Sequence, residues 1–310
     1  MDAQDNVYVG SWTNAILFKI TPAGVQSQFV GSSQGYADGQ GTNALFRSFE
    51  ALVIAPNGNF YIADTSNNRI RQVTPGGAVT TFAGQSTAAS VDAIGTNAQF
   101  NSPQGIGADT NGNLYVSDYN THKIRKISPA AVVSTIAGTG SLGYADGIGT
   151  SATFAYPTGI AVDTNTVLYI VCASNSVRVI SPTGAVTTLA GSTSGSSGHV
   201  DGQGTSALFW NSNYASIVVD QVGSLYTGDR NNNMIRKITS SGWVTTIAGT
   251  GSTGNVDGVG TTAQLRGPQG LAISSSGFLY FANSLVSTVR RIPLYASSLG
   301  EFRVSVCFSR

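Results

Sequence analysis

The sequence predicts an all-β fold, namely a six-bladed β-propeller of four-stranded antiparallel blades whose first blade is incomplete at the N-terminus. The first observation is a repeat: the tyrosine of the phrase Gly-Asn-Leu-Tyr-Val recurs at Tyr8, Tyr61, Tyr115, Tyr169, Tyr226 and Tyr280, at intervals of 53 to 57 residues. The second is that each repeat holds four short apolar runs separated by turn residues. A unit of this kind cannot cover its own apolar faces, so neighbouring copies must pack on one another.

The strands of one unit follow in order between residues 104 and 138. Residues 104–109 form a short apolar strand, and Asn111-Gly112 supplies the positive φ angles of a tight hairpin. Residues 114–117, 123–127 and 132–137 are the second, third and fourth strands. The same pattern predicts blades at about 1–31, 50–84, 104–138, 158–191, 215–249 and 269–308, together 23 strands within a single domain, residues 1–310.

The blades are joined by linkers with their own repeat, Asp-Gly-x-Gly-Thr. Eight residues after each linker aspartate stands a bulky apolar residue, which we interpret as a plug between adjacent blades: Phe46, Phe100, Phe154, Phe209 and, in the last linker, Leu265.

Both ends of the chain depart from the repeat. The first residues align with the middle of a unit, so the inner strand of the first blade is missing and upstream sequence is expected. Near the other end, Phe302, Val304, Val306 and Phe308 alternate with polar residues, which is typical of a half-buried strand. This strand could be the outer strand of the sixth blade or the inner strand of the first, and we favour the sixth blade.

Composition excludes several classes of function. Sixteen basic and fifteen acidic residues give a net charge of +1, so nucleic-acid binding through a global basic field is not expected. No apolar run reaches the length of a membrane span, and two cysteines cannot form a disulfide framework or a cysteine-rich zinc site. A surface rich in Ser, Thr and Gly slightly favours an extracellular or cell-surface location, although the compartment stays open.

The acidic residues follow the repeat, which indicates a structural role. Twelve of thirteen aspartates fall at three repeat positions. One of these positions lies seven residues before an arginine of the third strand. We predict that the two side chains form an ion pair between the second and third strands in three blades. The pairs are Asp64 and Arg71, Asp118 and Arg125, and Asp229 and Arg236. The alternative for these arginines is a basic stripe for nucleic acid.

The linker Asp-Gly-x-Gly-Thr, the lead-in Pro-x-Gly-Ile, the phrase Gly-Asn-Leu-Tyr-Val-x-Asp and the run Asn-x-x-Ile-Arg-Lys-Ile together resemble the NHL-repeat family of six-bladed propellers, over residues 2 to 292. The resemblance implies a binding face on the side of the linkers and the loops between second and third strands. Some six-bladed relatives are metal-dependent lyases or lactonases. This chain has only His122 and His199, at different repeat positions, and only Glu50 and Glu301, so a histidine triad cannot be built.

A binding patch is expected where one copy of the repeat differs from the others in length and sequence. The linker that contains His199 is the longest, and the lead-in that follows it is two residues longer than the others. We therefore predict a ligand-binding rim of Trp12, Asn68, Tyr119, His122, His199, Trp210, Tyr214 and Arg230. The alternative is that Trp210 merely fills the space left by the absent Pro and Gly.

Taken together, these observations favour a non-catalytic recognition scaffold for a protein, peptide or glycan. We expect a monomeric domain of a larger protein, with no catalytic residue, metal or cofactor. Two alternatives remain: a metal-dependent propeller hydrolase or lyase, and an RNA-binding propeller.

Overall fold

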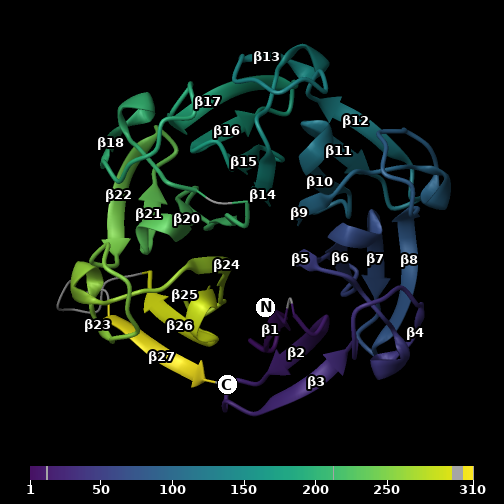
Figure 1. The fold of residues 1–310 in the computed structure, drawn as a ribbon, viewed down its shortest axis with the longest axis horizontal. Coiled ribbons are helices and arrows are strands. Elements are labelled where there is room, and N and C mark those ends of the chain that lie inside the picture. Colours follow the sequence, from purple (N-terminus) through teal and green to yellow (C-terminus); the bar gives the residue numbers. More distant parts are fainter. Residues whose placement is uncertain (12, 212, 295–302, 310) are drawn as a thin grey trace.

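The computed structural model is a ring of six antiparallel sheets around a central axis (Figure 1). It describes residues 1–11, 13–211, 213–294 and the backbone of residues 303–309. The described residues contain no α-helix, only single turns of 3₁₀ helix. Among the helical turns that are described, none has the length and apolar character that a membrane crossing requires.

The first three blades take up the first half of the chain. Blade 1 contains β1 (Val7–Ser11), β2 (Ile16–Ile20) and β3 (Gln26–Val30). Blade 2 contains β4 (Gly39–Gln40), β5 (Phe49–Ile54), β6 (Phe60–Asp64), β7 (Arg69–Val73) and β8 (Ala78–Gly84). Blade 3 contains β9 (Pro103–Ala108), β10 (Leu114–Asp118), β11 (Lys123–Ile127) and β12 (Val133–Ala137).

The other three blades repeat the plan. Blade 4 contains β13 (Gly147–Ile148), β14 (Pro157–Val162), β15 (Leu168–Cys172), β16 (Ser176–Ile180) and β17 (Ala185–Gly191). Blade 5 contains β18 (Gly202–Gln203), β19 (Ile217–Val219), β20 (Leu225–Asp229), β21 (Met234–Ile238) and β22 (Trp243–Ala248). Blade 6 contains β23 (Gly258–Val259), β24 (Pro268–Ile273), β25 (Phe278–Asn283), β26 (Thr288–Pro293) and β27 (Arg303–Ser309).

The 3₁₀ turns fall at two repeat positions. One set follows the linker strand: η1 (Gly41–Asn43), η3 (Gly95–Asn97), η5 (Gly149–Ser151), η6 (Gly204–Ser206) and η8 (Gly260–Thr262). The other joins the second and third strands of a blade: η2 (Thr65–Asn67), η4 (Tyr119–Thr121), η7 (Arg230–Asn232) and η9 (Ser284–Val286).

The predicted fold is confirmed, with one addition. Of the 27 strands in the described part of the chain, four are two-residue strands from the linkers, and the remaining 23 match the predicted number. Each short strand pairs with the outer strand of the blade that follows it, as β4 does with β8, which makes four of the sheets five-stranded. The reason is that each of these linkers runs along the outer strand of the following blade before the chain enters the inner strand of that same blade.

The first and last blades of the chain adjoin and close the ring at the junction of blades 6 and 1. Strand β27 pairs with β26, so it is the outer strand of blade 6, the place that we favoured from the sequence. Blade 1 has three strands with β1 at its inner edge, as its incomplete repeat predicted. In Figure 1 the label N lies beside β1, near the centre of the ring, and the label C lies at the end of β27.

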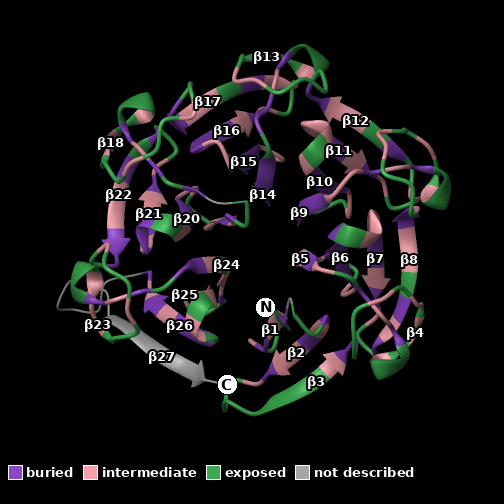
Figure 2. Cartoon of the chain, in the orientation of Figure 1, coloured by how far each residue is buried: buried purple, intermediate pink, exposed green. Residues whose placement is uncertain are grey.

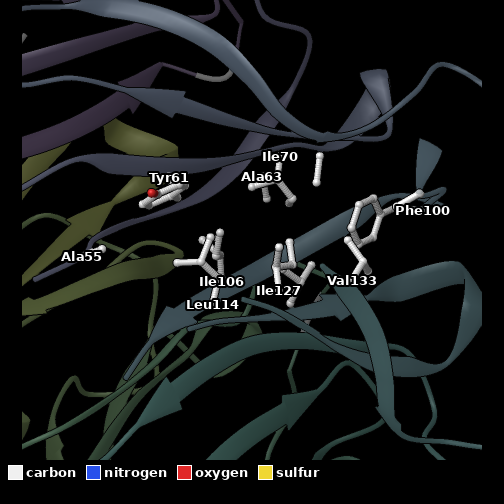
Figure 3. Close-up of a cluster of buried hydrophobic side chains, with 12 residues drawn as sticks. Ala55, Tyr61, Ala63, Ile70, Phe100, Ile106, Leu114, Ile127 and Val133 are labelled. Atoms are coloured by element: carbon white, nitrogen blue, oxygen red, sulfur yellow. The ribbon is translucent and has the colours of Figure 1, made fainter. Parts of the chain in front are cut away.

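The apolar core lies between neighbouring blades. Between blades 2 and 3, Phe100 is fully buried with Ile70, Leu114, Ile127 and Val133 (Figure 3). The plug residues of the other linkers, Phe46, Phe154, Phe209 and Leu265, are also 0% exposed. Truncation of such an aromatic residue to alanine costs about 3–5 kcal/mol, so the plugs contribute much of the contact between blades. Burial is greatest in the second strand of a blade, where every residue of β6, β10, β15 and β20 is buried, and it falls toward the outer strands (Figure 2).

The chain leaves the outer strands of blades 1 to 5 through a glycine with positive φ. Gly84, for example, has a φ of +94°, and a Cβ placed there would lie 2.5 Å from the carbonyl oxygen of Asn68. A larger residue would therefore push the end of β8 away from the loop between β6 and β7.

Candidate functional site

The repeated aspartates and arginines form a buried clamp inside each complete blade. In blade 3, Arg125 lies between two carboxylates: its Nη1 is 3.0 Å from Asp118 Oδ2 and its Nη2 is 2.6 Å from Asp92 Oδ1. The same nitrogens donate to the carbonyl oxygens of Gln99 and Val91. The arginine thus joins the second strand of its own blade to the preceding linker.

Blades 2 and 5 hold the same two-carboxylate clamp. Arg71 binds Asp64 at 2.8 Å and Asp38 at 2.6 Å. Arg236 binds Asp229 at 2.7 Å and Asp201 at 2.8 Å. The contact between second and third strands that the spacing of seven predicted is therefore present in the three blades that have both partners.

The linker aspartate is the partner that the sequence analysis missed. It binds the arginine in all five complete blades, including blade 4, where Arg178 is 2.9 Å from Asp146, and blade 6, where Arg290 is 2.8 Å from Asp257. The signal was available, because the linker aspartate stands 32 to 35 residues before the arginine in every copy.

The pKa values of Asp118 and Asp92 are shifted in opposite directions. Burial raises the pKa of Asp118 to about 6, against the lowering effect of the hydrogen bond from the backbone N–H of Asn101 and of the charge on Arg125. The linker carboxylate Asp92 is partly exposed; its burial raises the pKa, but the hydrogen bonds from Thr135 and Arg125 outweigh this and hold the pKa below its ordinary value. Both groups serve the contact between strand and linker.

An aromatic cluster lies on the face that carries the loops between second and third strands, here called the linker face. The ring of Tyr156 lies 5.1 Å from that of Tyr119 and 4.8 Å from that of His122. Burial, together with the neighbouring Tyr156 and Tyr214, raises the pKa of Tyr119 to about 12. These three tyrosines come from blade 3 and from the segments that lead into blades 4 and 5, so they form one surface only when these three consecutive blades pack side by side.

His122 also has a structural role that its repeat position explains. Its Nδ1 accepts a hydrogen bond from the backbone N–H of Tyr156 at 3.3 Å. In blades 2, 4 and 5 the residue at this position is an asparagine, whose Oδ1 accepts the equivalent bond: Asn68 from Ser102, Asn175 from Asn211, and Asn233 from Gly267. All four have φ between 54° and 69°, a left-handed conformation in which Asn and His are enriched. We call this contact the inter-blade pin.

Arg230 and Tyr214 lie at the mouth of the central channel. The Arg230 Nε donates to Gln269 Oε1 at 3.1 Å, and its guanidinium carbon lies 5.5 Å from the centre of the Tyr214 ring. Both residues line a cavity of about 490 Å³ together with Glu50, Thr13 and Leu285. A second hollow of about 420 Å³ follows the channel and is also lined by Glu50, Tyr214 and Gln269.

The remaining predicted site residues lie apart from this cluster. His199 is exposed in the long linker, and Trp210 is 51% exposed; its backbone N–H donates to Asp229, and its carbonyl oxygen accepts from the backbone N–H of Asn231. Asn68 is engaged in the inter-blade pin of blade 2. Trp12 lies outside the described residues.

The sequence analysis also missed a set of polar residues at the channel mouth. Each follows the first residue of an inner strand and so occupies one repeat position: Glu50, Gln104, Thr158 and Gln269. We call them the channel-mouth ring. Three of the four follow the lead-in Pro and Glu50 follows Phe49, so the repeat position could have been recognised from the sequence, but only ring closure brings the four copies together.

No group of three His, Cys, Asp or Glu side chains that could hold a metal ion occurs in the described part of the chain. Cys172 is fully buried, and burial raises the pKa of its thiol to about 11.

Comparison with curated proteins gives partial matches to longer chains. Protein SUPPRESSOR OF QUENCHING 1, chloroplastic, from Arabidopsis thaliana is 30% identical over 285 residues, which are 86% of this chain and 27% of that protein. NHL repeat-containing protein 2 from Bos taurus is 42% identical over 83 residues, 26% of this chain and 11% of that protein. The chain thus spans only about a tenth to about a quarter of the curated relatives it matches.

Solved structures share the fold at low sequence identity. An auxiliary nutrient binding protein from Bacteroides ovatus superposes with a TM-score of 0.67 at 16% identity, covering 98% of this chain and 66% of that chain. Virginiamycin B lyase from Staphylococcus aureus superposes with a TM-score of 0.58 at 15% identity, covering 98% and 81%. The NHL repeat family matches residues 100–127, the stretch that holds strands β9, β10 and β11. The chain therefore combines a six-bladed β-propeller arrangement with a match to the NHL repeat over residues 100–127.

Proposed function

We propose that this propeller is a non-catalytic recognition module that binds a protein, peptide or glycan on its linker face. The observation that carries the proposal is the convergence of Tyr119, Tyr156, Tyr214 and Arg230 beside the cavity at the channel mouth. Tyrosine and arginine are the residues that most often anchor recognition surfaces, because they offer large contact area with a polar end.

The chemistry of the carboxylates supports binding over catalysis. Eight ion pairs engage the linker and strand aspartates with buried arginines, so these groups have a structural task. A fold shared with a nutrient binding protein agrees with a ligand-binding task, and the fold shared with a lyase makes an enzyme the alternative to be tested. We also propose that the chain is one domain of a larger protein, as its partial coverage of the curated relatives suggests.

Peptide and glycan arrays probed with the purified chain test the proposal. The test variant replaces Tyr119, Tyr156 and Tyr214 together by serine. The control is Trp243→Ser, because Trp243 is 49% exposed but starts β22, at the end of blade 5 opposite the loop between β20 and β21.

We expect array binding by the parent and by the control, and its loss in the triple variant at an unchanged melting temperature. Equal binding by all three proteins would overturn the assignment to the linker face. Stoichiometric metal in the purified protein together with turnover of a ligand would favour the lyase or hydrolase alternative.

A further inference from the structure

Arg230 differs in its surroundings from the five arginines of the clamps. Those five are buried, and each is paired with a linker aspartate. Arg230 is half-buried and forms no ion pair with a carboxylate of the described residues. It is a cation at the edge of a cavity whose charge is not neutralised by a direct contact within the described chain.

The Arg230 side chain is nevertheless held in position. Gln269 accepts the hydrogen bond of its Nε, and the ring of Tyr214 lies beneath the guanidinium group. No hydrogen bond among the described residues uses its Nη1 or Nη2. An arginine anchored in this way presents its planar fork with little loss of conformational entropy, and this fork matches the two oxygens of a carboxylate.

The cavity beside Arg230 is partly apolar. Its walls include Val9 and Phe18 of blade 1 and Leu285 and Val289 of blade 6. Five of the six junctions between blades are filled by a linker plug residue, whereas this one is formed by Phe18 and these aliphatic side chains around an open volume of about 490 Å³. An apolar group of a ligand would therefore be taken out of water here.

The adjoining hollow supplies a further polar contact. Gln104 of the channel-mouth ring is only 9% exposed, and its Oε1 has no hydrogen-bond partner. A buried amide oxygen without a partner costs free energy, which a ligand with an N–H or O–H group would recover.

We propose that the cavity at the junction of blades 1 and 6 binds an amphipathic carboxylate, with its carboxylate on the Arg230 fork and its apolar part against Phe18 and Val289. The inference rests on the proposed function, whose site it shares. A single negative charge fits better than a phosphate dianion, because the carboxylate of Glu50 lines the same cavity and would repel the second charge.

Binding of 3-phenylpropionate, followed by calorimetry and by chemical-shift changes in NMR spectra, tests the proposal. Two probes of similar shape accompany it: 3-phenylpropan-1-ol, which lacks the charge, and phenyl phosphate, which can carry two charges. The variants are Arg230→Gln and, as the matched control, Arg47→Gln, which removes an exposed cation outside the cavity.

We expect saturable binding of 3-phenylpropionate to the parent and to Arg47→Gln, and binding to Arg230→Gln that is weaker by roughly tenfold or more, the range of a lost charged hydrogen bond. The alcohol and the phosphate should bind more weakly than the carboxylate. Gln269→Met, which keeps the charge but frees the Nε, should weaken binding by a smaller factor and serves as the second variant if Arg230→Gln does not fold.

Absence of saturable binding, or equal affinity of the parent and both cavity variants, would overturn the carboxylate site. The recognition module would survive this result if array ligands still depended on the three tyrosines. If no array ligand bound but 3-phenylpropionate still did, the carboxylate site would stand and the recognition module would be overturned.

Discussion

Blades 3 and 4 show how one repeat position can lose its carboxylate. In blade 3 the buried Arg125 lies between Asp118 and Asp92, and Thr121 of the intervening loop donates to the Asp118 backbone carbonyl. In blade 4 the strand residue is Cys172, the loop to β16 is one residue shorter, and Arg178 is paired with the linker residue Asp146 alone. The comparison indicates that the linker carboxylate is the constant part of the clamp and the strand carboxylate is the dispensable part.

Arg125→Ala should have the largest effect on stability. It leaves the fully buried carboxylate of Asp118 without its cation, and breaking a buried pair costs about 3–5 kcal/mol. The matched variant Arg178→Ala removes an equal volume but leaves only Asp146, whose side chain is 51% exposed. Chemical denaturation should therefore give a smaller loss for Arg178→Ala, and equal losses would contradict the distinction between the two carboxylates.

Asp118→Asn should have an intermediate effect, about 1–3 kcal/mol for a disturbed buried hydrogen-bond group. Blade 6 already carries Asn283 at this position, where its Oδ1 accepts from the backbone N–H of Arg266. An asparagine is thus compatible with the clamp. A loss as large as that of Arg125→Ala would mean that the strand carboxylate is required after all.

The same residue predicts a dependence of stability on pH. The pKa of Asp118 is about 6 in the folded chain, above the ordinary value of 3.8, so the folded state holds the proton more tightly than the unfolded state. The contribution of Asp118 to the free energy of unfolding should be greatest below about pH 4 and should fall as the pH rises to about 6. Denaturation curves of parent and Asp118→Asn across this range should differ by this contribution, and parallel curves would exclude it.

His122→Asn should have the smallest effect, within about 1 kcal/mol, because asparagine already forms the inter-blade pin of blades 2, 4 and 5. Burial lowers the pKa of His122, so its contribution to stability is present above about pH 6.5 and is lost as the pH falls below this value. The asparagine variant should lack this loss. His122→Ala, the control without an acceptor, should be less stable than the asparagine variant at pH 7.5.

The sequence was sufficient for features that recur along the chain and insufficient for those created by ring closure. Six tyrosines at regular spacing predicted six blades, and the spacing of seven residues predicted the contact of Asp118 with Arg125. The contact of Asp92 with Arg125 spans 33 residues, because the linker doubles back over the outer strand. The contact of Arg230 with Gln269 joins two blades, and local pattern carries no information about it.

The position of the linker determines which segment of the chain can be duplicated or deleted to change the number of blades. The linker aspartate and the two-residue strand belong to the blade that follows them, since Asp38 binds Arg71 and β4 pairs with β8. Duplication or exchange of a module should therefore succeed when the chain is cut directly after the glycines that end the outer strands, such as Gly84 and Gly138. A cut just before an inner strand would separate an arginine from the linker aspartate that neutralises it. The sequence unit that can be duplicated therefore begins with the linker, before the first strand of the blade.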